Sequence, residues 1–269
     1  MKILSSLIYY PLRNIRIFIA HPINSSRNIV IIAAAFWRTA VVATHIRKVL
    51  LSDENADWSV KERGTYVWYV ARKYWAKWIL DFAGIKLEVN GAEKIDWSRY
   101  YIIIPNHNST LDLFIIIALI ENGRIVAKKE VLGFPFVGPA LRKGGQIVID
   151  RSNHKQAMEA IRKGMRDRPD CHTVFFAEGT RSPDGTVKPF KFGAFSQAKE
   201  LGQPIAPVFI EGTFDALPKG SLLRLKRNSR VKVTFRNIIP VSAIRRLDVE
   251  DLAIITRLKI MFGVSVCHD

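Results

Sequence analysis

The chain has 269 residues, of which 48% are hydrophobic and 24% are charged. This length is enough for one domain with an appendage, or for two small domains, with ample material for a buried core. The apolar content excludes a disordered chain, and the lack of repeated long apolar runs in the sequence excludes a polytopic membrane protein. Two cysteines, Cys171 and Cys267, exclude a disulfide scaffold and a four-cysteine zinc site, and we expect both to stay reduced.

The charge is strongly basic, with 41 Lys and Arg against 24 Asp and Glu and a net charge of +17. Such a balance indicates an anionic partner, either nucleic acid, an anionic membrane or a phosphorylated substrate. Residues 1–50 contain seven Lys or Arg and no acidic residue, and the same segment is strongly apolar. Basic arms that bind nucleic acid are not apolar in this way, so the pattern favours a membrane surface.

The amino-terminal segment does not resemble a signal peptide. Met1–Pro22 mixes apolar and basic residues, and it lacks the uninterrupted apolar core and cleavage site that signal peptides need. The most apolar stretch, Ile29–Thr44, is interrupted by Arg38, which costs about 2.5–3.5 kcal/mol at the centre of a spanning helix. Whether this stretch spans a membrane or lies along it is therefore open. Asp53–Asp57 is expected to be a polar linker.

Trp58–Phe82 combines aromatic and basic residues. Tyr and Trp favour the lipid headgroup layer, and Lys and Arg attract anionic lipid. The alternative is an ordinary core helix with a solvated basic face. We favour monotopic membrane attachment by this segment and the preceding helix. The residues concerned are Trp58, Tyr66, Trp68, Tyr69, Tyr74, Trp75 and Trp78 with Arg72, Lys73 and Lys77.

After Gly84, short β-rich runs alternate with helical stretches, which predicts an α/β layered domain with a mostly parallel central sheet flanked by helices. Several of the runs are continuously apolar, as in strands that are covered on both faces. We expect a helical membrane-attachment region at 1–84 and a catalytic domain at 85–269. The expected strands are Ile85–Val89, Tyr100–Ile104, Arg124–Ala127, Gln146–Ile149, Thr173–Ala177, Ile205–Ile210 and Val231–Arg236, and the expected helices are Leu111–Asn122, Asn153–Arg166, Phe192–Leu201 and Val249–Met261.

The segment Ile103–Asp112 is the most informative part of the sequence. An apolar strand ends at Pro105, His107 follows, and Asp112 comes five residues later at an expected helix start. In a continuous helix these two side chains would point about 140° apart, so a turn must lie between them if they meet. Asp112 could then orient the His107 ring and leave its second nitrogen free as a general base. The alternative is a loop histidine and a helix-start carboxylate that do no chemistry.

Two further strands end in polar residues. One runs into Glu178-Gly179-Thr180-Arg181, where glycine permits a close backbone approach and arginine suits phosphate, although a surface turn with a solvated ion pair is the alternative. The other, Gly145–Arg151, delivers an arginine to its carboxyl end, where ligands of α/β sheets bind. The strand around Ala206-Pro207-Val208 indicates nothing by itself.

Taken in order, these segments resemble the motifs of the glycerolipid acyltransferases, the family of 1-acylglycerol-3-phosphate acyltransferase. Asn106-His107-Asn108-Ser109-Thr110-Leu111-Asp112 is similar to the N-H-x-S-x-x-D signature of that family. The similarity extends over about 85–239. The second, third and fourth motifs correspond to Gly145–Arg151, Glu178–Arg181 and Ala206–Val208. Many members carry proline where this chain has Ala177, which leaves the exact acceptor open.

The resemblance implies transfer of a fatty acyl group from acyl-CoA or acyl-carrier protein to the free hydroxyl of 1-acylglycerol 3-phosphate, which gives phosphatidate. His107 would be the general base and Asp112 the residue that orients it. No metal and no cofactor is implied, and Ser109 need not be a nucleophile; the nucleophile elbow of α/β-hydrolases is absent from the sequence. The implied substrate-binding residues are Lys128, Arg151, Glu178, Gly179, Thr180 and Arg181.

The expected partners are anionic membrane lipid, a lysophospholipid acceptor and the acyl donor, without nucleic acid. The expected location is the cytoplasmic face of a membrane. Two other functions remain open at this stage. One is the same chemistry on another lysophospholipid or on glycerol 3-phosphate. The other is a non-catalytic protein that binds membrane surfaces, for which the basic helices would suffice.

Overall fold

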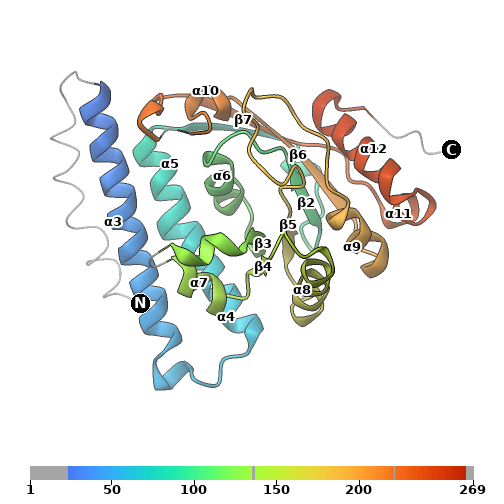
Figure 1. Ribbon diagram of the computed structural model, residues 1–269, viewed down its shortest axis with the longest axis horizontal. Coiled ribbons are helices and arrows are strands. Elements are labelled where there is room, and N and C mark those ends of the chain that lie inside the picture. Colours follow the sequence, from blue (N-terminus) through green and yellow to red (C-terminus); the bar gives the residue numbers. More distant parts are fainter. Residues whose placement is uncertain (1–23, 135–136, 221, 265–269) are drawn as a thin grey trace.

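One mostly parallel sheet runs through the middle of the molecule (Figure 1). The computed structural model describes residues 24–134, 137–220 and 222–264. The strand order is β1-β7-β6-β2-β5-β3-β4, and every described pair is parallel except β6 with β7. The strands are β1 (Lys86–Asn90), β2 (Ile102–Pro105), β3 (Gly123–Lys128), β4 (Ile147–Ile149), β5 (His172–Val174), β6 (Ile205–Glu211) and β7 (Arg230–Phe235).

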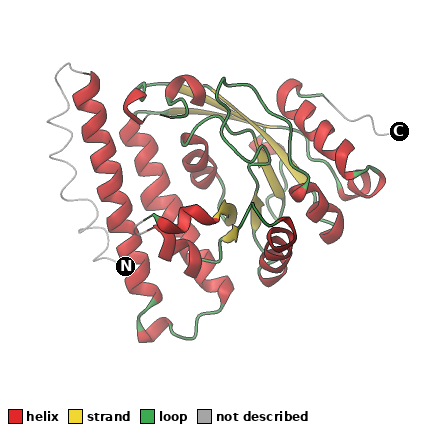
Figure 2. Cartoon of the chain, in the orientation of Figure 1, coloured by secondary structure: helices red, strands yellow, loops and turns green. Residues whose placement is uncertain are grey.

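Helices cover both faces of this sheet (Figure 2). On one face lie α6 and a long helical segment in which the π-helical turn η3 joins α4 to α5. On the other face lie α8, α9, α11 and α12. The helices are α3 (Asn24–Leu50), α4 (Val60–Val70), α5 (Lys77–Ala83), α6 (Leu111–Leu119), α7 (Val137–Lys143), α8 (His154–Asp167), α9 (Gly193–Leu201), α10 (Thr213–Ala216), α11 (Val241–Arg246) and α12 (Val249–Phe262), and η3 is Ala71–Ala76.

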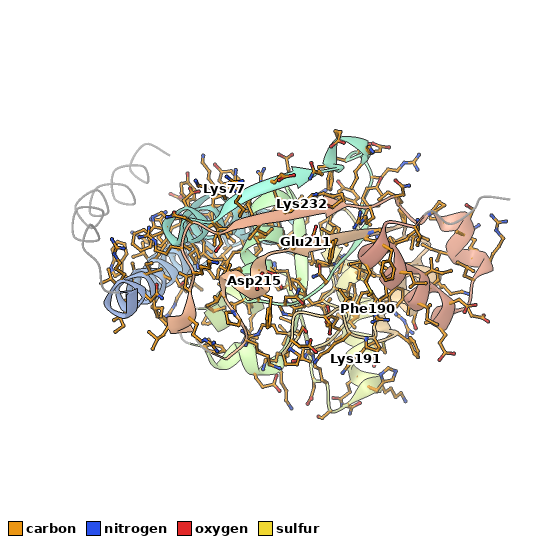
Figure 3. The ribbon with its side chains drawn as sticks, turned by 90° about the horizontal axis from the view of Figure 1, so that it is seen from above. Lys77, Phe190, Lys191, Glu211, Asp215 and Lys232 are labelled. Atoms are coloured by element: carbon orange, nitrogen blue, oxygen red, sulfur yellow. The ribbon has the colours of Figure 1, made fainter. Side chains whose placement is uncertain are left out.

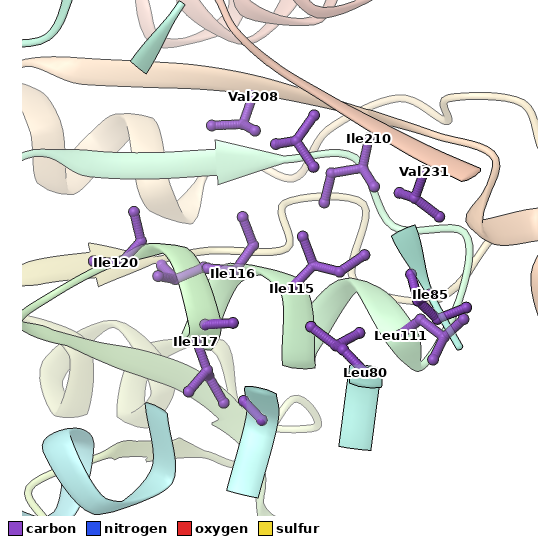
Figure 4. Packing of buried hydrophobic residues seen from close by; sticks show 14 of the residues in the cluster. Leu80, Ile85, Leu111, Ile115, Ile116, Ile117, Ile120, Val208, Ile210 and Val231 are labelled. Carbon is purple, nitrogen blue, oxygen red and sulfur yellow. The ribbon is translucent and has the colours of Figure 1, made fainter. Parts of the chain in front are cut away.

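The alternation of side chains along β2 divides the core into two layers. Ile103 faces α5 and α6, whereas Ile102 and Ile104 face the layer of α8 and α9, and all three are fully buried. Figure 4 shows the first layer, in which Ile115 and Ile116 of α6 lie between the sheet and α5. Because β2 is buried on both faces, its apolar run is continuous, as the sequence predicted.

The sheet ends at β1, which lies beside the antiparallel pair of β7 and β6, and some side chains in this part of the sheet are solvated. Glu211 of β6 and Lys232 of β7 are partners in the register and are both exposed (Figure 3). Such opposite charges across a strand pair contribute modestly to stability. The chain reaches this edge through Gly84, whose φ of +72° ends α5 in the left-handed region and whose Cβ position lies 2.8 Å from Asn228 Oδ1.

The aromatic and basic segment Trp58–Phe82 is helical and packs largely into the core. This is the alternative to membrane attachment that the sequence left open. A capping box between Ser59 and Glu62 starts α4. Trp68 is buried, and its indole donates to Ile120 O at 2.8 Å. Trp75 packs edge-on against Phe114 of α6, with ring centroids 4.9 Å apart. What this segment presents outward is therefore limited: its exposed large apolar residues are Val60 and Tyr69.

Helix α3 is the apolar helix that the sequence indicated. Its part Arg27–Leu50 is long and apolar enough to cross a membrane by length and composition. Arg38 is buried on the protein side, where its Nε donates to Tyr74 O at 2.7 Å and its guanidinium lies 5.3 Å from the Trp78 ring centroid. The opposite side of the helix is apolar and exposed. Met1–Pro22, for which we expected neither a signal peptide nor a span, lies outside the described residues, as does Cys267.

The predicted fold class is confirmed, and the seven expected strands are all present. Their ends agree with the expected ones to within three residues. The helix expected over Leu111–Asn122 ends at Leu119, because Ile120 is extended and leads into β3. Helices α7, α10 and α11 were not predicted, since each is only seven residues or shorter. The division of the chain at residue 84 stays a prediction.

Candidate active site

His107 and Asp112 meet at the carboxyl end of β2. The chain leaves the sheet at Pro105 and turns through 106–110 before α6 begins, so Asp112 lies in the first turn of that helix. His107 Nδ1 lies 3.0 Å from Asp112 Oδ2, and Asp112 is fully buried. The same oxygen accepts the backbone N–H groups of Asn108 at 2.7 Å and Ser109 at 2.8 Å. The turn that the spacing required is therefore closed by the carboxylate itself.

These contacts decide which nitrogen of the His107 ring carries the proton. Asp112 Oδ2 accepts two amide N–H groups and thus acts as a carboxylate oxygen, so the third contact requires Nδ1–H as the donor. His107 Nε2 then keeps its lone pair, and no described residue hydrogen-bonds to it. The side chain of His107 is 18% exposed, and its ring lies against Phe176 with centroids 4.1 Å apart. The geometry provides a half-buried imidazole that is ready to accept a proton.

The backbone around His107 is held from three directions. Asn106 pairs with β6, since its Oδ1 accepts from Ile210 N at 2.7 Å and its Nδ2 donates to Ile210 O at 3.0 Å. His107 N donates to Glu178 Oε1 at 2.7 Å, and His107 O accepts from Ser182 N at 2.7 Å. Asn106, Glu178 and Ser182 are all buried. The His107 loop is thereby fixed to β6 and to the segment that follows β5, the two neighbouring strands of β2.

Ser109 has a structural position. Its Oγ donates to Leu217 O at 2.7 Å and accepts from Leu111 N at 3.1 Å, and the residue is fully buried. The hydroxyl donates to Leu217 O and not to the His107 ring, so this Ser-His-Asp set is not arranged as a hydrolase triad, in which the serine proton is taken by histidine.

Glu178 uses both of its carboxylate oxygens on backbone amides. Besides His107 N, it accepts from Lys188 N at 3.2 Å through Oε2. Burial is the main cause that raises the pKa of Glu178 from 4.5 to about 7; the two amide N–H groups lower it and the charge of Asp112 raises it further. Glu178 therefore joins the His107 loop to the segment before α9, and its oxygens are directed to the protein.

The two arginines of the second and third motifs approach the same turn. Arg151, just after β4, donates to Gly179 O. Arg181 donates from Nη1 to Thr110 Oγ1 at 2.7 Å, which places its guanidinium beside the His107 loop. Gly179 has a φ of +75°, and its Cβ position is approached by Lys191 Cε at 2.8 Å, so this turn requires glycine unless the lysine moves. Thr180 is exposed between the two arginines.

Lys128 lies at the end of β3 and is exposed. It is at the same carboxyl edge of the sheet as His107, Arg151 and Glu178, but no contact with them is formed in the described part of the chain. The neighbouring Lys129 is paired with Asp150 instead. The parallel strands thus gather all four motif segments at one edge, as expected for ligand sites in such sheets.

Two cavities border this edge. One, of about 160 Å³, is almost wholly apolar and lies between α3, α4, α6, β3 and α7; Leu113 and Ile117 of α6 line it. The other, of about 400 Å³, lies between the ends of β4 and β5 and helices α8 and α9. Phe175, Phe176 and Met158 form its apolar wall, and Arg151 and Lys191 are also among its lining residues. Because Phe176 also touches the His107 ring, the second cavity adjoins His107 directly.

Sequence reasoning missed three residues that build this site. Ser182 and Leu217 act through their backbone groups, which leave no signal in the sequence. Lys219, in the loop after α10, places its Nζ 3.3 Å from Thr180 Oγ1, and the basic character of that loop was a signal that could have been used.

The fold is shared with a solved structure. The 1-acyl-sn-glycerophosphate (LPA) acyltransferase PlsC from Thermotoga maritima superposes with a TM-score of 0.71 over 90% of this chain and 96% of that chain, at 24% sequence identity. At this level of identity the comparison establishes the architecture.

The sequence comparisons cover more than half of the chain. The 1-acyl-sn-glycerol-3-phosphate acyltransferase of Limnanthes alba is 34% identical over 162 residues, which are 59% of this chain and 56% of that protein. The 1-acyl-sn-glycerol-3-phosphate acyltransferase alpha of Bos taurus is 32% identical over 174 residues, 63% of this chain and 60% of that protein. The matches thus span somewhat more than half the length of these relatives. Together with a match of residues 86–211 to the model of the Acyltransferase family, they confirm the resemblance found in the motifs.

Proposed function

We propose that this protein transfers a fatty acyl group from acyl-CoA or acyl-carrier protein to the free hydroxyl of 1-acylglycerol 3-phosphate, which gives phosphatidate. The observation that carries the proposal is the His107–Asp112 pair, with Nδ1 bound to a buried carboxylate and Nε2 without a partner among the described residues. The names of the relatives from Limnanthes alba and Bos taurus support the same reaction and the same acceptor.

In the proposed reaction His107 Nε2 removes the proton of the acceptor hydroxyl while its oxygen attacks the thioester carbonyl carbon. Asp112 holds the ring in the required tautomer and stabilises the imidazolium that forms. The tetrahedral intermediate collapses by breaking the carbon–sulfur bond, and the thiolate takes the proton back from His107. The products are an ester and a free thiol, so the balance needs neither metal nor redox cofactor.

Arg151 and Arg181 are proposed to bind the acceptor phosphate. Arg151 donates one N–H to Gly179 O, and Arg181 donates one to Thr110 Oγ1. Each guanidinium has further N–H groups that can donate to phosphate oxygens. Gly179 and Thr180 form the turn between them, and Lys128 is a further cation at the same edge. For Glu178 the geometry supports positioning of the His107 loop, because a carboxylate would repel the phosphate.

The acyl chains need apolar space, and both cavities beside the sheet edge are suited to it. Leu113 and Ile117, which line the smaller cavity, follow Asp112 on the same helix. The larger cavity touches Phe176 beside the base and has Arg151 and Lys191 among its lining residues, which suits an amphiphile with an anionic head. Two cavities agree with a reaction that brings two acyl chains together.

Helix α3 is proposed to attach the protein to the membrane that holds its substrates. Ile29, Phe36 and Trp37 on its outer side are 56%, 61% and 42% exposed, and Arg47 and Lys48 follow at its end. Aromatic and basic residues in this arrangement favour the lipid interface, and their charge favours the cytoplasmic leaflet with its anionic lipid. Arg38 is buried against α5, so its charge does not face lipid.

A transfer assay with product analysis by mass spectrometry tests the proposal. Wild type and His107→Ala are given oleoyl-CoA, or oleoyl-acyl-carrier protein, with lysophosphatidate, with a choline lysophospholipid, or with glycerol 3-phosphate. We expect phosphatidate from wild type, and at least a 100-fold slower reaction from the variant because base catalysis contributes about 10²–10⁴-fold. Another acylated product would keep the reaction and change the acceptor. Turnover that survives in His107→Ala would refute the base, and failure with both donor classes would favour the membrane-binding function.

A further inference from the structure

The loop that follows α10 carries a cation that none of the four motifs includes. Lys219 is exposed, and its Nζ lies 3.3 Å from Thr180 Oγ1 and 3.3 Å from Arg181 O. An ammonium group donates in both contacts. Lys219 therefore lies at the Gly179–Arg181 turn, although it is about 40 residues away along the chain.

The backbone on which Lys219 stands is tied to the catalytic loop. Ser109 Oγ donates to Leu217 O at 2.7 Å in a buried contact, and Lys226 N donates to Ala216 O at 2.7 Å on the other side of the loop. Lys219 is thus two residues from a carbonyl that is bonded to the His107 loop. This connection assigns the buried Ser109 hydroxyl a role, to hold the Lys219 loop against the His107 loop, which base catalysis by His107 does not require.

The charges around this turn are not neutralised. In the described part of the chain, Arg151, Arg181 and Lys219 form no ion pair with a carboxylate within 4.0 Å, whereas Lys129, also at this edge, is paired with Asp150. Asp215 on α10 is exposed and unpaired with Lys219. Three cations from separate segments that approach one turn without an acidic partner favour an anion with more than one charge.

We propose that Lys219 is a third phosphate ligand, which binds the phosphomonoester of the acceptor together with Arg151 and Arg181. The proposal rests on the function proposed above and adds selectivity to it. A phosphomonoester carries a charge of about −1.5 to −2 at pH 7, whereas the phosphodiester of other lysophospholipids carries one charge. A third cation therefore favours lysophosphatidate over acceptors with larger headgroups.

Calorimetric titration of lysophosphatidate into the donor-free protein in detergent micelles tests this proposal without turnover. The variants are Lys219→Ala, Lys219→Gln and Lys219→Arg, with Lys226→Ala as the control, an exposed lysine in the next part of the same segment. We expect the Kd to rise about tenfold for Ala and Gln, as is usual for a lost charge-assisted hydrogen bond, and to change less than twofold for Arg and for the control.

The variants separate charge from structure. Glutamine can still donate to Thr180 and to the Arg181 carbonyl, so wild-type affinity in Lys219→Gln would mean that Lys219 only closes the loop, and the proposal would be wrong. Unchanged affinity in Lys219→Ala would overturn it as well. A parallel titration with CoA distinguishes the phosphate source, because weaker binding of CoA alone would assign Lys219 to the donor. A failure of the proposed transfer reaction would appear separately, in the His107 assay.

Discussion

Replacement of Glu178 by glutamine tests how the catalytic loop is held, and its effect on stability depends on pH. Burial raises the pKa of Glu178 to about 7 from 4.5, so the folded protein binds this proton more tightly than the unfolded chain does. Its contribution to stability is therefore full below pH 4.5 and is lost as the pH rises to about 7. The difference between the two values corresponds to about 3 kcal/mol.

Glutamine does not titrate, so the unfolding free energy of Glu178→Gln lacks this dependence on pH, whereas all other titrating groups remain. We expect the unfolding free energy of wild type relative to the variant to fall by about 3 kcal/mol between pH 4.5 and pH 8. Chemical denaturation of both proteins at pH 4.5, 6 and 8 measures it. Glu121→Gln, at a carboxylate that is 84% exposed, serves as the control with no such slope. A difference that stays constant over this range would show that Glu178 ionises normally, and the account of its burial would be wrong.

The same substitution should lower turnover most at high pH, where the contribution of Glu178 to stability has been lost. Only the ionised carboxylate has both oxygens free to accept from His107 N and Lys188 N, whereas the amide of glutamine presents its own N–H groups to one of them. We expect kcat of Glu178→Gln to be about tenfold lower than that of wild type at pH 8, because one buried amide loses its partner. This ratio should shrink at pH 6, where Glu178 in wild type is largely protonated. A ratio that does not change with pH would refute the positioning role.

Three further substitutions test other parts of the site. Ser109→Ala leaves Leu217 O without its buried donor and should cost about 1–3 kcal/mol in chemical denaturation while transfer continues; loss of transfer with unchanged stability would make Ser109 a nucleophile. Arg181→Ala should raise the KM for lysophosphatidate about tenfold and leave the KM for oleoyl-CoA within twofold, and an equal change in both would remove Arg181 from the acceptor site. Phe36→Ser combined with Trp37→Ser should lower binding to anionic vesicles at least tenfold in a sedimentation assay.

The vesicle experiment has a matched control on the other side of the molecule. Ile254 and Phe262 of α12 are 54% and 65% exposed, so Ile254→Ser with Phe262→Ser removes similar apolar area. In Figure 1, α12 and α3 lie at opposite ends of the longest axis. Equal loss of vesicle binding in both pairs would mean that exposed apolar area in general, and not α3, mediates attachment.

The strands could be predicted because burial on both faces leaves a continuous apolar run, as in Ile102–Ile104. The direction of β7 could not be predicted, because its pairing with β6 depends on the path of the chain between 212 and 229. The residue composition of a strand does not show whether it runs parallel or antiparallel to its neighbour. Similarly, the aromatic residues of α4 and α5 look alike in the sequence whether they face lipid or a sheet. The bond from Trp68 to Ile120 O shows which of the two applies, and it joins residues 52 positions apart.

In the site, the local turn between His107 and Asp112 could be predicted, whereas contacts between segments far apart in the sequence could not. The spacing of His107 and Asp112 required a turn, and the structure contains it, with Asp112 itself bonded to the turn amides. The sequence motif grouped Glu178 with the phosphate ligands, but it contains no information on where a carboxylate points. Its contacts to His107 N and Lys188 N follow from the strand order, which places β5 beside β2. The basic character of the Lys219 loop was visible in the sequence, but the position of Lys219 at this turn was not, because it depends on how β6 and α10 direct the chain.

The proton of Ser109 decides between the two reactions that Ser, His and Asp could serve. In a hydrolase the serine oxygen attacks the carbonyl, so its proton must reach the histidine; here it is bonded to Leu217 O and not to the His107 ring. In the proposed reaction the attacking oxygen therefore comes from a bound molecule, and water and the acceptor hydroxyl compete for His107. An acceptor held by its phosphate raises the local concentration of the correct hydroxyl, which is how positioning favours one nucleophile over another. In the proposed reaction, therefore, the cations around Gly179–Arg181 contribute to the choice of transfer over hydrolysis as well as to affinity.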